Sequence, residues 1–423
     1  MKLSELNLNP VAKVRESTNF AVREIKKVCK NIGPRAPGTE SENKAQDYIA
    51  ENCSKFADTV EKETFKLSPR AFMSWPWVAG TLLLLSSILY QLGAFDVVPS
   101  FSGGFFVLSL LLTVALLLII VFDFLLYKPI LDPFFKKSTS SNVMFVKKPK
   151  GEVRRRIIFG GHADSSYEWR YTHIGGAKML TTIIVMSFVM IALSLAIGIV
   201  SVAVDDINPT LLLVFKIVMA VGGLFFFVGV FFENGKVVVQ GANDNLTGVF
   251  ASLAVLQFLK TNNIDFENTE VIAVSTGAEE AGLRGSKFFA KTHAEEFNKV
   301  ETVFVGTDTL RDFDFMGIFT KDMTGTVKLD PQAAALLKKA SELSGLDLPY
   351  LSCFFGSSDA AAMQQGGIKS VLFAAMDPSP ARYYHTRLDT SDNLEIKTVE
   401  KGIEVLINAV LLFDEQGLKD EYE

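Results

Sequence analysis

Histidine and acidic side chains follow four short apolar runs in this chain. The runs are residues 157–159, 271–274, 303–305 and 371–373. The side chains that follow them are His162 and Asp164, Glu279 and Glu280, Asp308, and His385 and Asp389. Buried strands of an open α/β sheet read as short apolar runs, and ligands gather beyond the carboxyl ends of such strands. Together with Asp244, which lies in a Gly-Ala-Asn-Asp-Asn sequence, this pattern predicts a metal site with room for two ions.

The adjacent acids Glu279 and Glu280 are the most specific part of the pattern. Two neighbouring carboxylates repel each other unless a metal ion or a proton neutralises one of them. One of the pair can therefore bind a metal while the other takes a proton from the attacking water. Gly277 and Gly282 flank the pair and permit an unusual backbone. The alternative is a loop with two solvated acids.

The other candidate ligands also have ordinary structural explanations. His162 could be a surface histidine, or a ligand whose second ring N–H is bound by Asp164. Asp244 could cap a helix, or bridge two cations with its two oxygens. Asp308 ends a buried strand, where an isolated acid needs a partner. A set of nitrogen and oxygen donors without thiolates suits Zn²⁺, with Mn²⁺ or Co²⁺ as alternatives.

His385 lies in the run Tyr-Tyr-His-Thr-Arg-Leu-Asp. In this run Tyr384 could hydrogen-bond a developing oxyanion, and Asp389 could support a ligand. The remaining histidines have no acids beside them at strand ends, so we expect His173 in a loop and His293 on a helix surface. The three cysteines form neither a disulfide pattern nor a thiolate zinc motif.

Strands and helices alternate in the polar part of the chain, which predicts an α/β fold with a mostly parallel sheet and helices on both faces. We expect helices at about 9–31, 41–56, 246–259, 286–297, 331–344 and 399–415. A strand is expected at 59–66, and residues 141–146 and 153–159 are expected to form a hairpin around Pro149-Lys150-Gly151.

Four apolar stretches are each long enough to cross a membrane, which takes about 20 residues of helix. They are residues 75–95, 105–127, 180–204 and 210–232. They predict two transmembrane hairpins inserted into one folded domain. The expected division is 1–73, hairpin 74–127, 128–179, hairpin 180–232, and 233–423.

Lysines and arginines flank the spans on the side of the polar domain, and the hairpin tips carry acids without Lys or Arg. The positive-inside rule therefore predicts an integral membrane protein whose polar domain and both termini are cytoplasmic. Residues 1–20 have no apolar core, so we expect no cleavable signal peptide. Asp123 and Lys216 lie at different depths, and we expect both to reach an interface rather than to pair. The net charge of −5 predicts no nucleic-acid partner.

The motifs resemble those of the zinc-dependent exopeptidases of the aminopeptidase Y and aminopeptidase S type, whose relatives include glutamate carboxypeptidase II and glutaminyl cyclases. The matching segments are 157–165 (IIFGGHADS), 241–248 (GANDNLTG), 278–286 (AEEAGLRGS), 358–359 (SD) and 384–389 (YHTRLD). The resemblance runs from about residue 31 to the C-terminus and includes the Gly33-Pro34-Arg35 turn.

This resemblance implies an aminopeptidase that uses two zinc ions to remove N-terminal residues from peptides, and the four apolar stretches add a membrane anchor to it. The implied roles are Asp244 as the bridge between the ions, His162 and Asp308 on one ion, Glu280 and His385 on the other, Glu279 as general base, Tyr384 as a support for the tetrahedral intermediate, and Asp164 and Asp389 as supports behind the ligands. The resemblance implies a peptide substrate, the apolar stretches predict the lipid bilayer as a partner, and a homodimer formed through the hairpins stays open.

Two other functions stay open on the sequence alone. A zinc acyltransferase similar to glutaminyl cyclase would use one ion, and the full set of ligands argues against it. A catalytically silent membrane scaffold or receptor usually loses ligands, and none is missing here. The sequence does not distinguish amino- from carboxypeptidase with certainty and does not specify the preferred residue at the cleaved position.

Overall fold

The computed structural model describes residues 10–379 and 381–422. Residues 1–9, part of the segment in which no signal peptide is expected, lie outside the described residues. Contacts divide the chain into two compact units. The polar unit comprises the described residues up to Pro69, Lys136–Tyr167 and those from Val237 onward. The hairpin unit comprises Arg70–Phe135 and Glu168–Lys236.

A nine-stranded sheet forms the centre of the polar unit, with the order β1-β2-β6-β3-β7-β11-β8-β10 and β9 paired to β8. The four central strands are parallel: β6 (Thr269–Thr276), β3 (Arg155–His162), β7 (Glu301–Leu310) and β11 (Ser370–Ala375). The other strands are β1 (Thr59–Leu67), β2 (Ser138–Lys147), β8 (Met316–Asp322), β9 (Val327–Lys328) and β10 (Tyr350–Ser352). Antiparallel pairs occur on both sides of the parallel centre.

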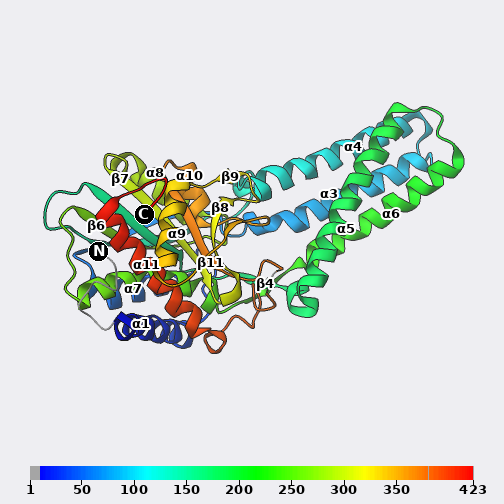
Figure 1. Cartoon of the computed structure of the whole chain (residues 1–423). Coiled ribbons are helices and arrows are strands. Elements are labelled where there is room, and N and C mark those ends of the chain that lie inside the picture. Colours follow the sequence, from blue (N-terminus) through cyan, green and yellow to red (C-terminus); the bar gives the residue numbers. More distant parts are fainter. Residues whose placement is uncertain (1–9, 380, 423) are drawn as a thin grey trace. The chain divides into compact units, whose positions relative to one another are not determined.

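Helices cover both faces of this sheet, which confirms the α/β class (Figure 1). Helices α1 (Pro10–Asn31), α7 (Thr247–Thr261), α9 (Pro331–Leu343) and α11 (Ile396–Gln416) pack together in the main core. Helices α8 (Arg284–Phe297) and α10 (Asp359–Gln365) pack against each other on the opposite face. Helix α2 (Glu40–Cys53) contacts β2.

The central strands read as continuous apolar runs because both of their faces are buried. Ile157 and Phe159 of β3 belong to the main core that α7 also lines, whereas Ile158 is buried outside that cluster. Full burial of one such side chain contributes about 1.5–3 kcal/mol. Gly161 at the end of β3 lets α7 approach, since a Cβ there would lie 2.7 Å from the backbone of Gly248. The strand ends and the start of α7 are thereby held close together.

The predicted hairpin of residues 141–146 with 153–159 is wrong. Strand β6 lies between β2 and β3, antiparallel to β2 and parallel to β3. The turn residues Lys150 and Gly151 donate their amides to the carbonyls of Phe266 and Glu267, just before β6, at 3.0 and 2.8 Å. The turn therefore packs against a segment distant in sequence, and turn composition alone does not reveal which strand enters between its neighbours.

The hairpin unit contains four helices that are long and apolar enough to cross a membrane. They are α3 (Trp75–Ala94), α4 (Ser102–Ile119) with a π-helical continuation (Ile120–Leu125), α5 (Arg170–Ala203) and α6 (Pro209–Phe232). A short two-stranded sheet joins β4 (Tyr167–Trp169) and β5 (Glu233–Val238) at the points where the chain enters α5 and leaves α6.

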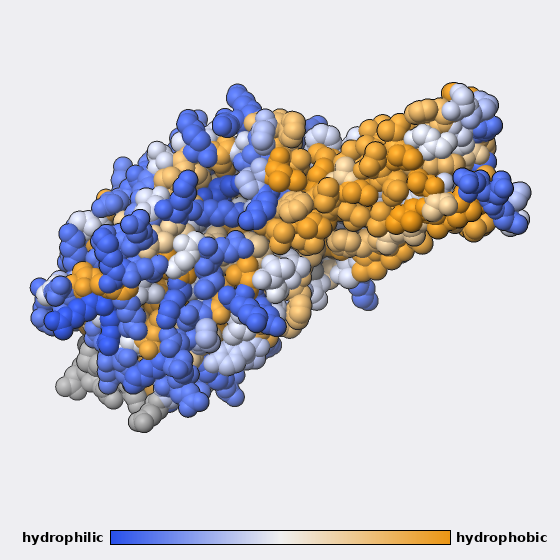
Figure 2. All heavy atoms as spheres, turned by 90° about the horizontal axis from the view of Figure 1, so that it is seen from above, coloured by the Kyte–Doolittle hydropathy of each residue, from blue (hydrophilic) through white to orange (hydrophobic). Residues whose placement is uncertain are grey.

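Apolar side chains of the hairpin unit face outward, as the apolar surface over its helices shows (Figure 2). Leu224, for example, is 61% exposed. The buried positions of the hairpin unit include hydroxyl groups. Ser86 Oγ lies 2.9 Å from both Ser109 Oγ and Thr113 Oγ1. This pattern suits a lipid environment, where polar groups must find hydrogen-bond partners inside the helix bundle.

Candidate metal centre

The carboxyl ends of the four parallel strands bring the predicted ligands together. They form two groups whose ligand atoms lie within 4.8 Å of one another. One group is His162, Asp244 and Asp308, and the other is Asp244, Glu280 and His385. Asp244 belongs to both groups, so all five residues proposed as ligands meet around one shared carboxylate.

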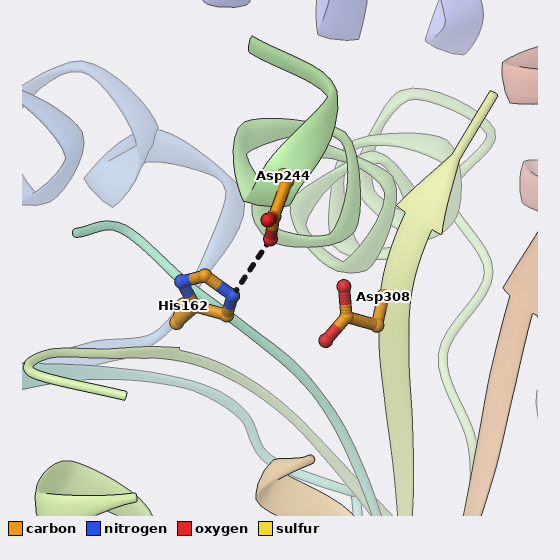
Figure 3. Close-up of side chains that lie close together, drawn as sticks. All are labelled: His162, Asp244 and Asp308. Atoms are coloured by element: carbon orange, nitrogen blue, oxygen red, sulfur yellow. Dashed lines mark ion pairs between the residues drawn. The ribbon is translucent and has the colours of Figure 1, made fainter. Parts of the chain in front are cut away.

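In the first group, His162 from β3 and Asp308 from β7 point toward Asp244 (Figure 3). His162 Nε2 lies 3.2 Å from Asp244 Oδ1. Burial by itself would lower the pKa of His162, but the carboxylates of Glu279, Asp164 and Asp244 outweigh it and raise that pKa well above its ordinary value. Burial and the nearby Asp244 raise the pKa of Asp308 to about 7.

In the second group, His385 Nε2 lies 3.0 Å from Asp244 Oδ2 and 3.0 Å from Glu280 Oε1. One ring nitrogen carries at most one hydrogen, so it cannot donate to both oxygens. Among the described residues, neither of these two buried oxygens accepts a hydrogen bond of good geometry. Burial opposes a rise in the pKa of His385, yet Glu280 and Asp244 raise it to about 10.

The residues fit a divalent cation such as zinc. The centre holds four carboxylates, those of Asp244, Asp308, Glu279 and Glu280, against two imidazoles. An excess of negative charge that is largely buried is costly without a counter-ion. Nitrogen and oxygen donors in two groups that share one carboxylate match the ligand types that zinc accepts.

Asp244 is held by its backbone rather than serving as a helix cap. Asp389 Oδ2 accepts from the amide of Asp244 at 3.1 Å, and Asp389 Oδ1 accepts from the amide and side chain of Asn243 at 2.8 and 2.7 Å. Helix α7 begins only at Thr247, with Leu246 at its N-cap position. The side chain of Asp389 therefore supports the segment of the shared carboxylate, and Asp244 keeps its oxygens for the centre.

Asp164 contacts the turn of the paired glutamates. Its Oδ1 accepts from the amide of Glu279 at 3.1 Å and its Oδ2 from the amide of Glu280 at 3.0 Å. The sequence suggested that this carboxylate binds the ring of His162. The ring Nδ1 lies 3.3 Å from the backbone oxygen of Asp164 and 3.5 Å from Oδ1, so the main partners of the carboxylate are the two amides.

Glu279 and Tyr384 lie beside the ligands without belonging to either group. Glu279 Oε2 is 3.8 Å from His162 Nε2. Burial, with added repulsion from Glu280 and Asp359, raises the pKa of Glu279 well above its ordinary value. The ring of Tyr384 stacks on His385 with centroids 3.9 Å apart, and burial raises the pKa of its hydroxyl.

Two buried residues near the centre were not predicted from the sequence to act there. Arg35 donates from Nε to the carbonyl of Ala163 at 2.6 Å and from its terminal nitrogens to Gln240 and Gly241 at 2.7 and 2.9 Å. It thus ties the segment after His162 to the segment before Asp244. Asp359, quoted only as part of a motif, accepts from Thr276 Oγ1 at 2.6 Å. The Gly-Pro-Arg turn was the one sequence signal for Arg35.

The other two histidines lie outside the centre. His293 is on α8, as expected for a helix, and its Nε2 lies 2.6 Å from Glu63 Oε1. His173 is in the first turns of α5, with Nδ1 3.9 Å from Glu168 Oε2. The expected loop position of His173 is wrong because α5 begins at Arg170, before its apolar stretch.

Comparison with known proteins agrees with this architecture. Residues 227–410 match the model of Peptidase family M28. A zinc aminopeptidase of Bacillus subtilis shares 14% identity with a TM-score of 0.54, covering 96% of each chain. An aminopeptidase of Aneurinibacillus sp. strain AM-1 shares 17% identity with a TM-score of 0.54, covering 95% of each chain. A glutaminyl cyclase of Bacteroides thetaiotaomicron shares 13% identity with a TM-score of 0.53, covering 93% of this chain and 97% of the cyclase.

These structures share the fold of the chain, and the family match includes four of the five proposed ligands, all except His162. The resemblance to zinc-dependent exopeptidases is thereby confirmed, with the similarity to Peptidase family M28 lying in residues 227–410.

Proposed function

We propose that the chain is a membrane-anchored aminopeptidase that uses two zinc ions to remove N-terminal residues from peptides. The observation that carries this proposal is the pair of ligand groups that share Asp244, with the carboxylate of Glu279 beside them. A centre with a shared carboxylate and a separate acid has both the ligands and the base that peptide hydrolysis needs.

In this proposal Asp244 would be a ligand common to both ions, His162 and Asp308 would hold one of them, and Glu280 and His385 would hold the other. When bound, zinc polarises the scissile carbonyl and acidifies the attacking water. Tyr384, stacked on His385, donates a hydrogen bond from its hydroxyl to the oxygen that gains negative charge.

Glu279 is the proposed general base. It takes a proton from the attacking water and delivers it to the leaving amine, a role that contributes typically about 10²–10⁴-fold. Its burial supports this role, because a carboxylate in a dry site accepts a proton more readily than one in water. Carboxylates near the site can also hold the free ammonium of the substrate. An ammonium held there would place the first peptide bond, and no later one, at the reacting position.

We further propose that residues 74–127 and 180–232 are membrane hairpins inserted into the peptidase domain, which lies in the cytoplasm. The four long apolar helices and their outward apolar side chains support this topology. Glycosylation acceptor sites placed in the two hairpin tips should be modified, and one placed at the C-terminus should not. The opposite result would contradict the cytoplasmic placement.

The activity is tested with purified full-length protein in detergent and a panel of fluorogenic aminoacyl substrates. We expect cleavage of substrates with a free amine and none of their N-acetylated forms. Glu279→Gln should keep its bound zinc and lose about 10²–10⁴-fold in kcat, because only the base is removed. Glu295→Gln, an exposed glutamate on α8, is the matched control and should be fully active. Full activity of Glu279→Gln would refute the assignment.

The fold shared with a glutaminyl cyclase makes cyclisation of N-terminal glutamine the second candidate. Such an enzyme would cyclise a Gln-initiated peptide without releasing an amino acid. The same substrate panel, extended by a Gln-initiated peptide and read by mass spectrometry, separates the two activities.

A further inference from the structure

Side chains hold the backbone amides of the turn that carries Glu279 and Glu280. Four consecutive amides of this turn donate to side-chain oxygens. They are Gly277 to Asn142 Oδ1 at 3.1 Å, Ala278 to Glu42 Oε1 at 2.7 Å, Glu279 to Asp164 Oδ1 at 3.1 Å and Glu280 to Asp164 Oδ2 at 3.0 Å. The acceptors come from β2, α2 and the loop after β3. Three separate elements therefore fix the path of the turn.

Glu42 makes the shortest of these four contacts and is itself fully buried. Its Oε1 also accepts from Ser140 Oγ at 2.8 Å, and its Oε2 accepts from the amide of Gly38 at 2.7 Å. Both oxygens are thus engaged with groups from three segments. Three hydrogen bonds to one fully buried side chain leave it little freedom to move.

The backbone of Ala278, which Glu42 contacts, has a strained conformation that needs such support. Ala278 has a φ of +53°, in the left-handed region, which costs a residue with a Cβ about 1–2 kcal/mol. A conformation of this kind persists only where the surroundings enforce it. There is also no spare room, because a Cβ on Gly277 would lie 2.5 Å from Ser140 Oγ and 2.9 Å from Glu42 Oε1.

From the local sequence alone, Glu42 would be expected to cap the N-terminus of α2. Thr39 is the N-cap of α2 and Glu42 stands three residues later, the spacing of a capping box. In the structure Thr39 Oγ1 accepts from the amide of Glu42, but the Glu42 carboxylate reaches across to Ala278. Glu42 belongs to neither ligand group.

We propose that Glu42 is a positioning residue for Glu279. By holding the amide of Ala278 it fixes the strained residue directly before the base, and so sets where the Glu279 carboxylate lies relative to the ligands. The catalytic part of this inference rests on the proposed function of Glu279, whereas the ordering of the turn does not.

The experiment compares three variants of the full-length protein. Glu42→Ala removes both oxygens. Glu42→Gln keeps one oxygen that can accept from Ala278. Glu40→Gln is the control, because Glu40 lies on the same helix and its carboxylate is exposed and pairs with Lys44. The first measurement is hydrogen exchange of peptides covering residues 277–283 in metal-free protein, with peptides from α9 as an internal reference. The second is zinc content, kcat and KM.

We expect Glu42→Ala to speed exchange in 277–283 and to lower kcat about 10–100-fold, the loss typical when a group supporting a metal site is removed. KM and zinc content should change less than twofold, Glu42→Gln should recover most of kcat, and Glu40→Gln should match wild type. If Glu42→Ala does not fold, Glu42→Asp replaces it. Its shorter side chain cannot reach both Gly38 and Ala278, so it should show the same selective loss of kcat.

Unchanged exchange and unchanged kcat in the folded, zinc-loaded variant would overturn the inference. So would a rise in KM or a loss of zinc that accounts for the whole effect, since Glu42 would then act on binding. Failure of the proposed function is seen separately, as a wild-type protein without cleavage. The exchange data still decide whether Glu42 orders the turn.

Discussion

The two units of this chain place their large apolar side chains differently, inside one unit and on the surface of the other. In the polar unit Phe250 is completely buried in the main core, whereas in the hairpin unit Leu224 is 61% exposed. Inside the hairpin unit, hydroxyl groups such as those of Ser86 and Thr113 are buried beside apolar side chains such as Leu116. The difference is the one expected if, as proposed, water surrounds the polar unit and lipid surrounds the hairpin unit.

Charge is distributed just as unequally. The polar unit concentrates carboxylates and imidazoles at one end of its parallel strands, where they compete for few donors. Such a concentration is stable only with counter-charge, so it marks a place for cations rather than a structural element. This distribution agrees with the proposal that the polar unit carries the chemistry and the hairpin unit the anchor.

The largest expected effect comes from Asp244→Asn, which removes the carboxylate common to both ligand groups. An amide cannot bridge two cations, so we expect zinc content to fall below one ion per chain and activity to drop by about 10³-fold or more. Zinc is measured by mass spectrometry after gel filtration. Asp420→Asn, an exposed acid near the C-terminus, is the control. Zinc content unchanged from wild type would contradict the bridging role.

A smaller effect is expected from a charge on the outer face of the hairpin unit. Leu224→Lys places an ammonium near the middle of α6, which costs about 2.5–3.5 kcal/mol for insertion at a helix centre. The membrane-integrated fraction after alkaline extraction should fall. The comparison is Phe354→Lys in the polar unit, where the side chain is already 82% exposed and integration should not change. Equal integration of both variants would remove the distinction between the two surfaces.

The smallest effect is expected from the buried hydroxyls of the hairpin unit. Ser86→Ala removes contacts to Ser109 and Thr113 on the neighbouring helix, and such bonds contribute about 0.6 kcal/mol on average in membrane bundles. Thr81→Ala, which loses only a bond to Trp77 of its own helix, is the control. Thermal unfolding in detergent should place Ser86→Ala slightly below this control. A loss of several kcal/mol would mean that the hydroxyls dominate the packing.

The sequence predicts the parts of this molecule that depend on local pattern. The central strands, most helices and the four apolar spans follow from runs and periodicities that each segment contains by itself. The pairing of β2 with β6 does not, because it depends on which distant strand fits between two neighbours.

The same limit applies to the centre. Most of the proposed ligands, and the supports Asp164 and Asp389, were recognisable from residue type near strand ends, whereas Glu42 and Arg35 were not. Glu42 meets Ala278 across 236 residues, and Arg35 meets Gly241 across 206. Both look like turn or cap residues until the fold brings their partners to them.

The most direct test of the two-ion account is a zinc titration of metal-free, full-length protein, with bound zinc and cleavage of an aminoacyl substrate followed together. The account predicts saturation at two zinc ions per chain, with activity absent in the metal-free protein and restored as the ions bind. Full cleavage by the metal-free protein, or no zinc bound at saturation, would contradict it.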